Sequence, residues 1–295
     1  MYKKEQALYC LMLLPAVALL IIFSVIPMIG IVISFQDFLP GRGWFGSPWV
    51  GFRNFEFVFT MPDSWIILRN TLFIASGKII LGTLTAILFA LLLNEIRNKT
   101  FKKLTQTAVY LPHFISWVIY ATIMRYMLTG NGVVNNLLGL LGIEPVLFLS
   151  KESIFPWTLI ITDVLKEFGF TAVIYLASIS NIDPTYYEAA IMDGAGRFKQ
   201  TIYITIPSIT PTIVLMAVLS MGNILQAGFD QVFNMYSPAV YVTGDIIDTY
   251  VYRVGLMSIN YGLGTAVGLL KSVVSFTLIT ISYWLANKFA NYRLF

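Results

Sequence analysis

Long apolar runs dominate the pattern of this chain. Six segments each hold about 20 residues with few charges, the length at which an α-helix crosses the hydrocarbon core of a bilayer. Helices are expected because lipid cannot satisfy the backbone groups of an open strand. The predicted spans are residues 8–35, 71–93, 105–128, 155–179, 208–229 and 263–286. The pattern predicts an all-α membrane protein with six transmembrane helices, organised as one domain over residues 1–295.

The first apolar run follows Lys3 and Lys4, as a signal peptide would. It is longer than the 7 to 15 residues of a signal-peptide core, and it lacks a small-residue cleavage site. We therefore expect an uncleaved first helix, with kinks or boundaries at Pro15 and Pro27.

The basic residues between the spans predict the orientation. With the N-terminus inside, the inner segments hold ten Lys and Arg residues and the outer segments hold four, which satisfies the positive-inside rule. The inner set is Lys3, Lys4, Arg97, Lys99, Lys102, Lys103, Arg197, Lys199, Lys288 and Arg293; the outer set is Arg42, Arg53, Lys151 and Arg253. An even number of spans then places both termini in the cytoplasm.

Composition supports a lipid environment and argues against most enzyme classes. Hydrophobic residues make up 57% of the chain and charged residues 12%, against roughly 25% charged in an ordinary soluble domain. One cysteine, Cys10, and one histidine, His113, leave no disulfide, zinc set or Ser-His-Asp triad. The chain is expected to bind no metal or cofactor and no nucleic acid, since the inner basic residues account for its charge of +4.

One inner loop carries a strong local pattern. Asp183 followed by Pro184 is typical of a helix start, because the carboxylate caps free N–H groups and proline suits the first turn. Gly194 and Gly196 predict its end, and Pro207 marks the start of the fifth span. A helix of about ten residues is too short to be stable alone, so it should pack on its own bundle or on a partner.

This loop resembles the EAA signature of ABC importer permeases. Glu188-Ala189-Ala190 is followed at the signature spacing by Gly194 and by Ile206-Pro207, with Ile206 where leucine is commonest. Three further stretches resemble permeases for complex oligosaccharides: residues 92–98, 110–117 and 247–256. No phosphate-binding loop is present, because Lys271-Ser272 follows leucines within an apolar span, so ATP hydrolysis must be supplied by another chain.

The resemblance implies a type I ABC importer fold with a cytoplasmic coupling helix in the loop 181–207. The residues implied to contact the ATPase are Tyr187, Glu188, Ala189, Ala190, Asp193, Gly194, Ala195 and Arg197. It also implies a second permease chain, two cytoplasmic ATPase subunits that use ATP and Mg, an extracytoplasmic solute-binding protein and an oligosaccharide substrate, all at a bacterial cytoplasmic membrane. An interface-lying helix without a partner is the alternative interpretation of the loop.

Charged residues within spans are costly and mark candidate pathway residues. Asp163, Lys166 and Glu167 lie near the middle of the fourth span, where Asp163 could pair with Lys166, and Lys271 of the sixth span could answer Glu167. A structural charge network and direct contact with a sugar are both open.

Amides and aromatic rings suggest contacts with a hydroxyl-rich ligand. Asn223, Gln226 and Asp230 are spaced to share one face of the fifth span. The rings that could cover sugar C–H surfaces are Trp117, Tyr175 and Phe229, although packing is the commoner role.

Three other features favour structural roles. Lys78 and Arg125 are expected to extend toward the lipid headgroups, and His113 to be a hydrogen-bonded packing residue. Residues 230–260 are expected to contain a short amphipathic helix at the interface.

Two rival functions remain open at this stage. An ion-gradient-driven secondary transporter would show an inverted repeat, and no clear repeat is visible. An intramembrane enzyme or scaffold would explain Asp163 and Glu167 without transport. The sugar, its length and its charge are not specified by these patterns.

Overall fold

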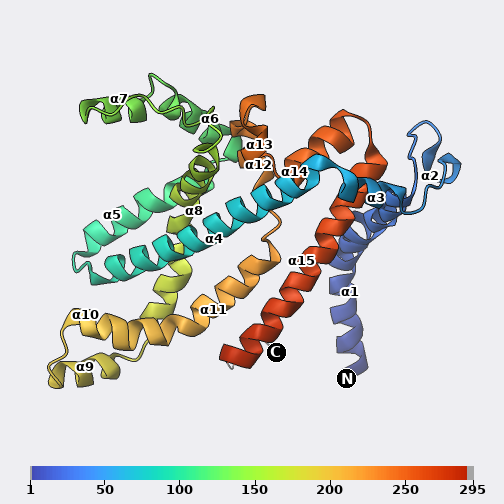
Figure 1. The fold of residues 1–295 in the computed structure, drawn as a ribbon. Helices are drawn as coiled ribbons and strands as arrows, with labels where there is room; N and C mark the ends of the chain where they lie inside the picture. The colour runs from blue at the N-terminus through green and yellow to red at the C-terminus, as the bar shows by residue number, and fades with distance from the viewer. Residues whose placement is uncertain (1, 291–295) are drawn as a thin grey trace. The chain divides into compact units, whose positions relative to one another are not determined.

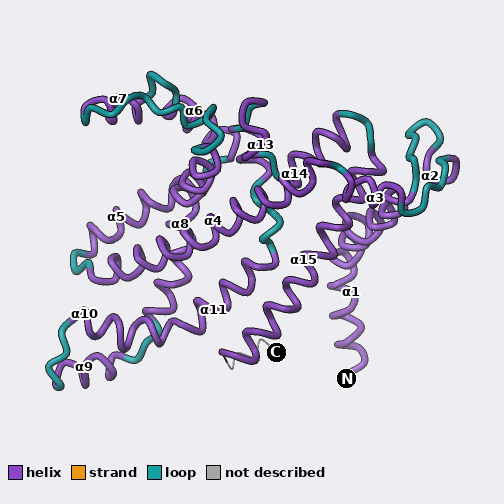
Figure 2. Tube along the Cα trace, in the orientation of Figure 1, coloured by secondary structure: helices purple, strands orange, loops and turns teal. Residues whose placement is uncertain are grey.

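Helices form the regular structure of the chain, as the apolar pattern predicts. The computed structural model describes residues 2–290, and within them the only extended pairing is an isolated bridge between Gln36 and Trp49 (Figures 1 and 2). The all-α fold class is therefore confirmed. Among the predicted inner basic residues, Arg293 and the side chains of Lys3, Lys4 and Lys288 lie outside the described part.

The chain divides into two compact units. The first comprises Met1–Ser64 and Tyr250–Ser272, and the second comprises Trp65–Thr249 and Val273–Phe295.

The first unit begins with a continuous helical run. α1 (Tyr2–Leu20) passes into a π turn (Ile21–Val25) and a 3-10 segment (Ile26–Phe35). Pro15 lies inside α1, whereas Pro27 lies in the first turn of the 3-10 segment, where the helical geometry changes. α2 (Gly43–Gly46) and α3 (Arg53–Thr60) follow in the segment that leads to α4. Asn54 of α3 donates to the carbonyls of Ser34 (2.9 Å) and Gln36 (3.0 Å), which attaches α3 to the end of the first run.

The second unit is built on three long helical segments. They are α4 (Pro62–Glu95), α8 (Phe155–Ser180) and the run Arg197–Gly222, in which α10 (Arg197–Gln200), a π turn (Thr201–Thr205) and α11 (Ile206–Gly222) are continuous. The fifth span therefore starts before Pro207, contrary to the prediction. Small residues let the helices approach closely: Ala86 and Ala90 of α4 and Ala172 of α8 form a buried cluster with Tyr175, Ile179 and Ile209.

The predicted third span, 105–128, is not one straight helix. α5 (Lys99–Tyr110) and the turn Leu111–Phe114 are followed by α6 (Trp117–Leu128) and α7 (Val133–Leu140), and the two halves meet at 104°. Pro112 cannot donate a helical hydrogen bond, and Ser116 caps the new helix by accepting from the Ile119 N–H at 3.4 Å. The apolar pattern of the sequence did not predict this break.

The segment 230–260 contains several short helices rather than one amphipathic helix. They are α12 (Phe229–Met235), a turn (Pro238–Val240), α13 (Tyr241–Gly244), α14 (Ile247–Tyr250) and a π segment (Val251–Met257). Asp245 is buried, and its carboxylate accepts a hydrogen bond from Thr249 at 2.7 Å. Asp245 therefore does not face water, and the location of these helices at a membrane interface stays a prediction.

Four helices among the described residues are long and apolar enough to cross a membrane, and the bent pair raises the number to five. The four are Tyr9–Phe35, Pro62–Glu95, Arg197–Gly222 and Tyr261–Trp284, the last within α15 (Tyr261–Ala290). α8 matches the predicted fourth span within a residue or two, but its three central charges set it apart from purely apolar spans.

Candidate functional site

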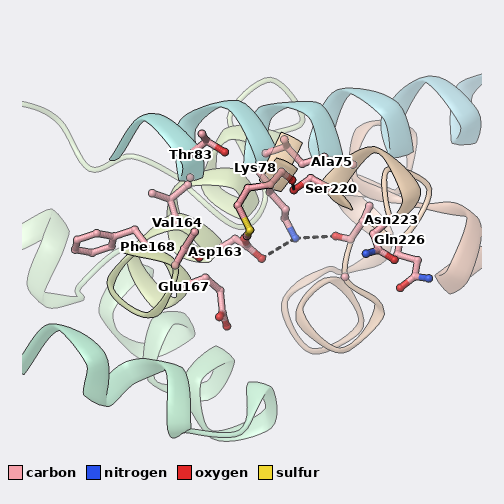
Figure 3. Close-up of a pocket in the computed structure, with 16 residues that line it drawn as sticks. Ala75, Lys78, Thr83, Asp163, Val164, Glu167, Phe168, Ser220, Asn223 and Gln226 are labelled. Carbon is pink, nitrogen blue, oxygen red and sulfur yellow. Dashed lines mark hydrogen bonds and ion pairs between the residues drawn. The ribbon is translucent and has the colours of Figure 1, made fainter. Parts of the chain in front are cut away.

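A polar cavity of about 290 Å³ lies in the second unit, between α4, α8 and the end of α11 (Figure 3). Charged side chains enter it from α4 and α8, and amides enter it from the segment that follows α11. The polar lining consists of Lys78, Thr83, Asp163, Glu167, Thr171, Ser220, Asn223 and Gln226. Three helices thus place charged, hydroxyl and amide groups around one space whose remaining lining is apolar.

Lys78 points into the protein rather than toward the lipid headgroups. Its side chain is 9% exposed, and its ammonium lies 3.1 Å from the carboxylate of Asp163. It also donates to the carbonyl of Ala227 at 2.7 Å and to the side-chain carbonyl of Gln231. The snorkelling prediction for Lys78 is therefore wrong. Lys78 lies midway along a 34-residue helix, at a depth where protein acceptors replace water.

Asp163 forms its ion pair with Lys78 of the neighbouring helix α4, so its predicted pairing with Lys166 is also wrong. The Lys166 ammonium instead lies 2.9 Å from Oε1 of Glu167, next to it in sequence, and donates to the carbonyl of His113 at 2.9 Å. Lys166 is almost fully buried, with 4% of its side chain exposed. The two acids on α8 thus have separate cations.

His113 completes the second charge cluster. Its Nδ1 lies 2.6 Å from Oε2 of Glu167, and its ring stacks on Phe170 at 3.9 Å. The expectation of a hydrogen-bonded packing residue is confirmed. Lys166 lies over the ring of Trp117, 5.0 Å from its centre, so one face of Trp117 is occupied by a cation.

The predicted polar face of the fifth span does not form. α11 ends at Gly222, and Asn223 and Gln226 lie in a turn closed by a hydrogen bond from the Gln226 N–H to the Asn223 carbonyl at 2.8 Å. Both side chains border the cavity (Figure 3), whereas Asp230 lies on α12 and is not among its lining residues. Gly222 and Asn223 mark the end of α11, and helical spacing alone, which ignores this stop signal, suggested a continuous face.

The remaining pathway candidates divide as follows. Tyr175 is wholly buried in the helix-packing cluster, which contradicts a sugar-facing role. Phe229 stacks on Phe233 at 5.2 Å within α12. Arg125 is exposed and donates a hydrogen bond to the Asn234 carbonyl at 3.3 Å. Lys271 belongs to the first unit, and its pairing with Glu167 stays a prediction.

The predicted helix of the inner loop forms as α9 (Pro184–Met192). Asp183 is its N-cap and accepts from the Thr185 N–H at 2.9 Å, and this backbone hydrogen bond lowers the pKa of the Asp183 carboxyl. At the other end, the Ala195 N–H donates to the Ala190 carbonyl (2.8 Å) and the Gly194 N–H to the Ile191 carbonyl (3.0 Å). This is a Schellman cap, and Gly194 adopts the φ of +76° that it requires.

α9 presents apolar side chains to its surroundings. Tyr186 and Ile191 are each 61% exposed, and Met192 is 87% exposed. Glu188, Ala189, Asp193, Gly194 and Arg197 are exposed as well, whereas Tyr187, Ala190 and Ala195 are half-buried. A short helix with an open apolar face is a surface that another element can cover.

The opposite side of the loop is attached to the bundle. The Tyr187 hydroxyl lies 2.9 Å from Oγ1 of Thr205 in the π turn, and the Gln200 side chain donates to the Ala195 carbonyl at 2.8 Å. Figure 1 shows α9 beside α10 at one end of the second unit. Arg197 pairs with Glu95 at the end of α4, so the loop is connected to two of the helices that line the cavity.

Sequence reasoning missed three of these residues as parts of a site. Lys78 was assigned to the headgroups because the second span was placed at 71–93; the actual helix, Pro62–Glu95, puts Lys78 at mid-depth. Glu95 and Thr205 gave no sequence signal, because their partners are about 100 and 18 residues away.

Long apolar helices around a polar cavity, with an exposed short helix at one end, are the architecture of a multi-pass membrane transport protein. Residues 78–291 match the family described as the binding-protein-dependent transport system inner membrane component, and the chain belongs to this family. Its role is therefore that of an inner membrane permease component, which transports rather than catalyses.

Curated relatives match over nearly the whole chain. Protein LplB of Bacillus subtilis (strain 168) is 40% identical over 294 residues, covering 99% of this chain and 92% of LplB. The polygalacturonan/rhamnogalacturonan transport system permease protein YteP of the same organism is 40% identical over 286 residues, covering 97% of this chain and 89% of YteP.

A solved structure has the same fold. A chain of a bacterial ABC transporter involved in the import of the acidic polysaccharide alginate superposes with a TM-score of 0.89 at 37% identity, covering 97% of both chains. The same kind of transporter has been solved in complex with a periplasmic protein that holds an alginate pentasaccharide, and that chain matches with a TM-score of 0.88 at 36% identity.

Proposed function

We propose that this chain forms half of the translocation pathway of an ABC importer for an oligosaccharide and is driven by a separate ATPase through α9. The observation that carries the proposal is the attachment of α9, an exposed short helix with the EAA pattern, to the helices that line the polar cavity. A displacement of α9 would therefore be transmitted to the cavity walls.

The proposed topology has six spans with both termini in the cytoplasm. The four apolar helices and the bent pair supply five. α8 supplies the sixth, because 26 residues extend about 39 Å at 1.5 Å per residue, against a hydrocarbon core of about 30 Å. Its charges are tolerable there because each faces a protein partner. We propose one permease domain over residues 1–295, with the coupling loop 181–207 within it.

An oligosaccharide suits the chemistry of the cavity. Asp163 is neutralised by Lys78, and Glu167 faces Lys166 and His113, so the side chains of this half that remain for a ligand are hydroxyls and amides. Such groups bind sugar hydroxyls by paired hydrogen bonds. The names of YteP and of the alginate transporter point to uronate-containing substrates. The carboxylates of such a substrate would find no surplus cation among the lining residues of this half.

The proposed complex contains four further components. They are a second permease chain, either distinct or a copy of this one, two cytoplasmic ATPase subunits that use ATP and Mg, and an extracytoplasmic solute-binding protein. Closure of the ATPase dimer would draw two coupling helices together and open the paired bundles outward, and hydrolysis would return them. The residues proposed to couple this chain to the ATPase are Tyr187, Glu188, Ala189, Ala190, Asp193, Gly194, Ala195 and Arg197. Tyr187 would do so from the bundle side, through its contact with Thr205.

Reconstitution tests this proposal and its rivals. The chain is purified with its co-expressed partners and placed in liposomes, and uptake of labelled oligogalacturonates and oligoalginates is measured with and without internal ATP. Uptake that requires ATP and the binding protein supports the proposal. Uptake driven by an ion gradient alone would establish a secondary transporter, and product formation without uptake would establish an enzyme. Glu188→Lys and Gly194→Asp should abolish ATP-driven uptake while the chain stays folded.

A further inference from the structure

Lys78 connects the cavity wall to the break in the fifth span. The ammonium of a lysine has three protons to donate. In this structure it has three acceptors: the Asp163 carboxylate at 3.1 Å, the Ala227 carbonyl at 2.7 Å and the side-chain carbonyl of Gln231. Each acceptor comes from a different part of the second unit, namely α8, the 223–228 segment and α12. No proton of Lys78 remains for a ligand.

Gln231, one of the three acceptors of Lys78, is itself held in place by hydrogen bonds. Gln231 is fully buried, and its amide donates to the Leu159 carbonyl at 2.7 Å and to Oγ1 of Thr162 at 2.9 Å. Lys78 therefore binds the 223–228 segment directly through Ala227, and Gln231 fixes the start of α12, directly after that segment, to α8. A hydrogen bond in a site of this depth is stronger than one in water because few competing partners are available.

Gly228 shows that the segment is built around the ammonium. Its φ of +92° is left-handed, and a Cβ placed on it would lie 2.9 Å from Nζ of Lys78. The backbone conformation therefore favours glycine at this position, and an added Cβ would press on the Lys78 ammonium. The chain turns here between α11 and α12, directly after the two amides that border the cavity.

We propose that Lys78 is a positioning residue that holds residues 223–228 in the non-helical conformation that presents Asn223 and Gln226 to the cavity. Lys78 does not itself bind the substrate, although it is a cation in the pathway. The consequence for selectivity rests on the proposed function: loss of the Lys78 contacts raises the KM for the oligosaccharide by displacing the amides. The structural consequence, a loosened 223–228 segment, does not depend on transport.

Cysteine accessibility tests the proposal on the purified transporter complex. Cys10 is the single cysteine of the chain, so Cys10→Ser gives a cysteine-free background, into which Gln226→Cys is introduced. Lys78→Met is combined with Asp163→Asn, because removing both charges leaves neither one buried without a partner. The rate of maleimide labelling at position 226 should rise about threefold to tenfold, the factor expected for loss of a hydrogen bond.

Matched controls separate this effect from general unfolding. Thr100→Cys lies on the exposed start of α5 in the same unit, and its labelling rate should not change. Gly228→Ala perturbs the segment from the other side while leaving both charges in place, and it should also raise labelling at position 226. It keeps the test available if the double substitution does not fold.

Unchanged labelling at position 226 in a folded variant of either kind overturns the proposal, whatever the outcome of the uptake assay. Raised labelling without any ATP-driven uptake in the wild-type complex would instead support the positioning role and refute the proposed function. A raised KM with unchanged turnover in the variants completes the expected result.

Discussion

The guanidinium of Arg197 donates a hydrogen bond to the carboxylate of Glu95, although the two residues are separated by 102 positions in the sequence. Arg197 is the first residue of α10, within the coupling loop 181–207, and Glu95 is the last residue of α4. The contact joins the loop to the helix that carries Lys78. Besides its proposed contact with the ATPase, Arg197 therefore has a second role as a tether within this chain.

Reversal of this ion pair separates the two roles. Arg197→Glu and Glu95→Arg should each lower the ratio of uptake to ATP hydrolysis, and the double reversal should restore most of it. The expected effects are modest, about 0.2–1 kcal/mol for an exposed pair, since the side chains are 58% and 45% exposed. Lys199→Glu, a neighbouring exposed cation, is the control. A double variant as impaired as Arg197→Glu alone would show that Arg197 acts on the ATPase only.

Gly194→Ala should weaken coupling through backbone strain. Gly194 has a φ of +76° and open space around it, so the added methyl group meets no atom and the cost is that of a left-handed non-glycine residue, about 1–2 kcal/mol. Gly196→Ala is the matched control, because Gly196 has a φ of −69° and equally open space. Thermal unfolding in detergent and the uptake-to-hydrolysis ratio are measured. Equal effects of the two substitutions would contradict the role of the cap.

The sequence predicted α9 closely because its signals are local. The caps of this helix depend on Asp183, Pro184 and Gly194, each of which acts within a few residues. Helix existence was predictable for the same reason, as apolar length is a local property. The bend at Pro112–Ser116 was missed because an apolar run reads alike whether its helix is straight or broken.

Partners of the charged residues could not be predicted from the spacing. Asp163 and Lys166 have the spacing of a helical ion pair, yet Asp163 pairs with Lys78 on another helix. Which cation pairs with Asp163 depends on how α4 packs on α8. The order of residues along α8 alone does not give that packing. The loss of the Asn223–Asp230 face has both a local and a distant cause: α11 ends at Gly222, and Lys78 of α4 donates a hydrogen bond to the Ala227 carbonyl in the segment that follows.

The capping role of Asp183 predicts a pH dependence. The hydrogen bond from the Thr185 N–H lowers the pKa of Asp183 in the folded chain, so the carboxylate stabilises the fold above its unfolded pKa. This contribution is lost as the pH falls through the folded pKa. The difference in thermal unfolding between the wild type and Asp183→Ala should be constant above about pH 5 and shrink below about pH 4.

Asp183→Asn provides the control for that measurement, because asparagine caps a helix without titrating over this range. Its difference from Asp183→Ala should not vary with pH. A wild-type difference that grows on acidification would contradict the assignment.

Gly169→Ala should destabilise the packing of α8 on α5. A Cβ at Gly169 collides with the backbone carbonyl of Val109, which cannot move aside as a side chain would. The expected cost is about 1–3 kcal/mol, measured as a lower temperature of unfolding. Gly139→Ala on α7 has open space and should instead be neutral or slightly stabilising. Equal stability of the two variants would argue against close contact between α5 and α8.

Asn223→Ala and Gln226→Ala should raise the KM for the transported oligosaccharide with little change in turnover at saturation. Each side chain borders the cavity, and loss of one hydrogen bond to a ligand corresponds to about threefold to tenfold in KM. Asp230→Asn, on α12, should leave the KM unchanged, since Asp230 is not among the lining residues. If Asp230→Asn raised the KM as much as Asn223→Ala does, the result would support a continuous polar face after all.

The central claim, that the ATPase drives this chain through α9, is tested most directly by crosslinking. A photoreactive amino acid is placed at Met192, which is 87% exposed at the end of α9, and the assembled transporter is irradiated in membranes. The account predicts an adduct with the ATPase subunit whose yield changes when ATP is added, whereas the same probe at Leu140, in the predicted outer loop, gives none. An adduct of the Met192 probe with lipid alone, or labelling of Met192 from the outer face, would contradict the account.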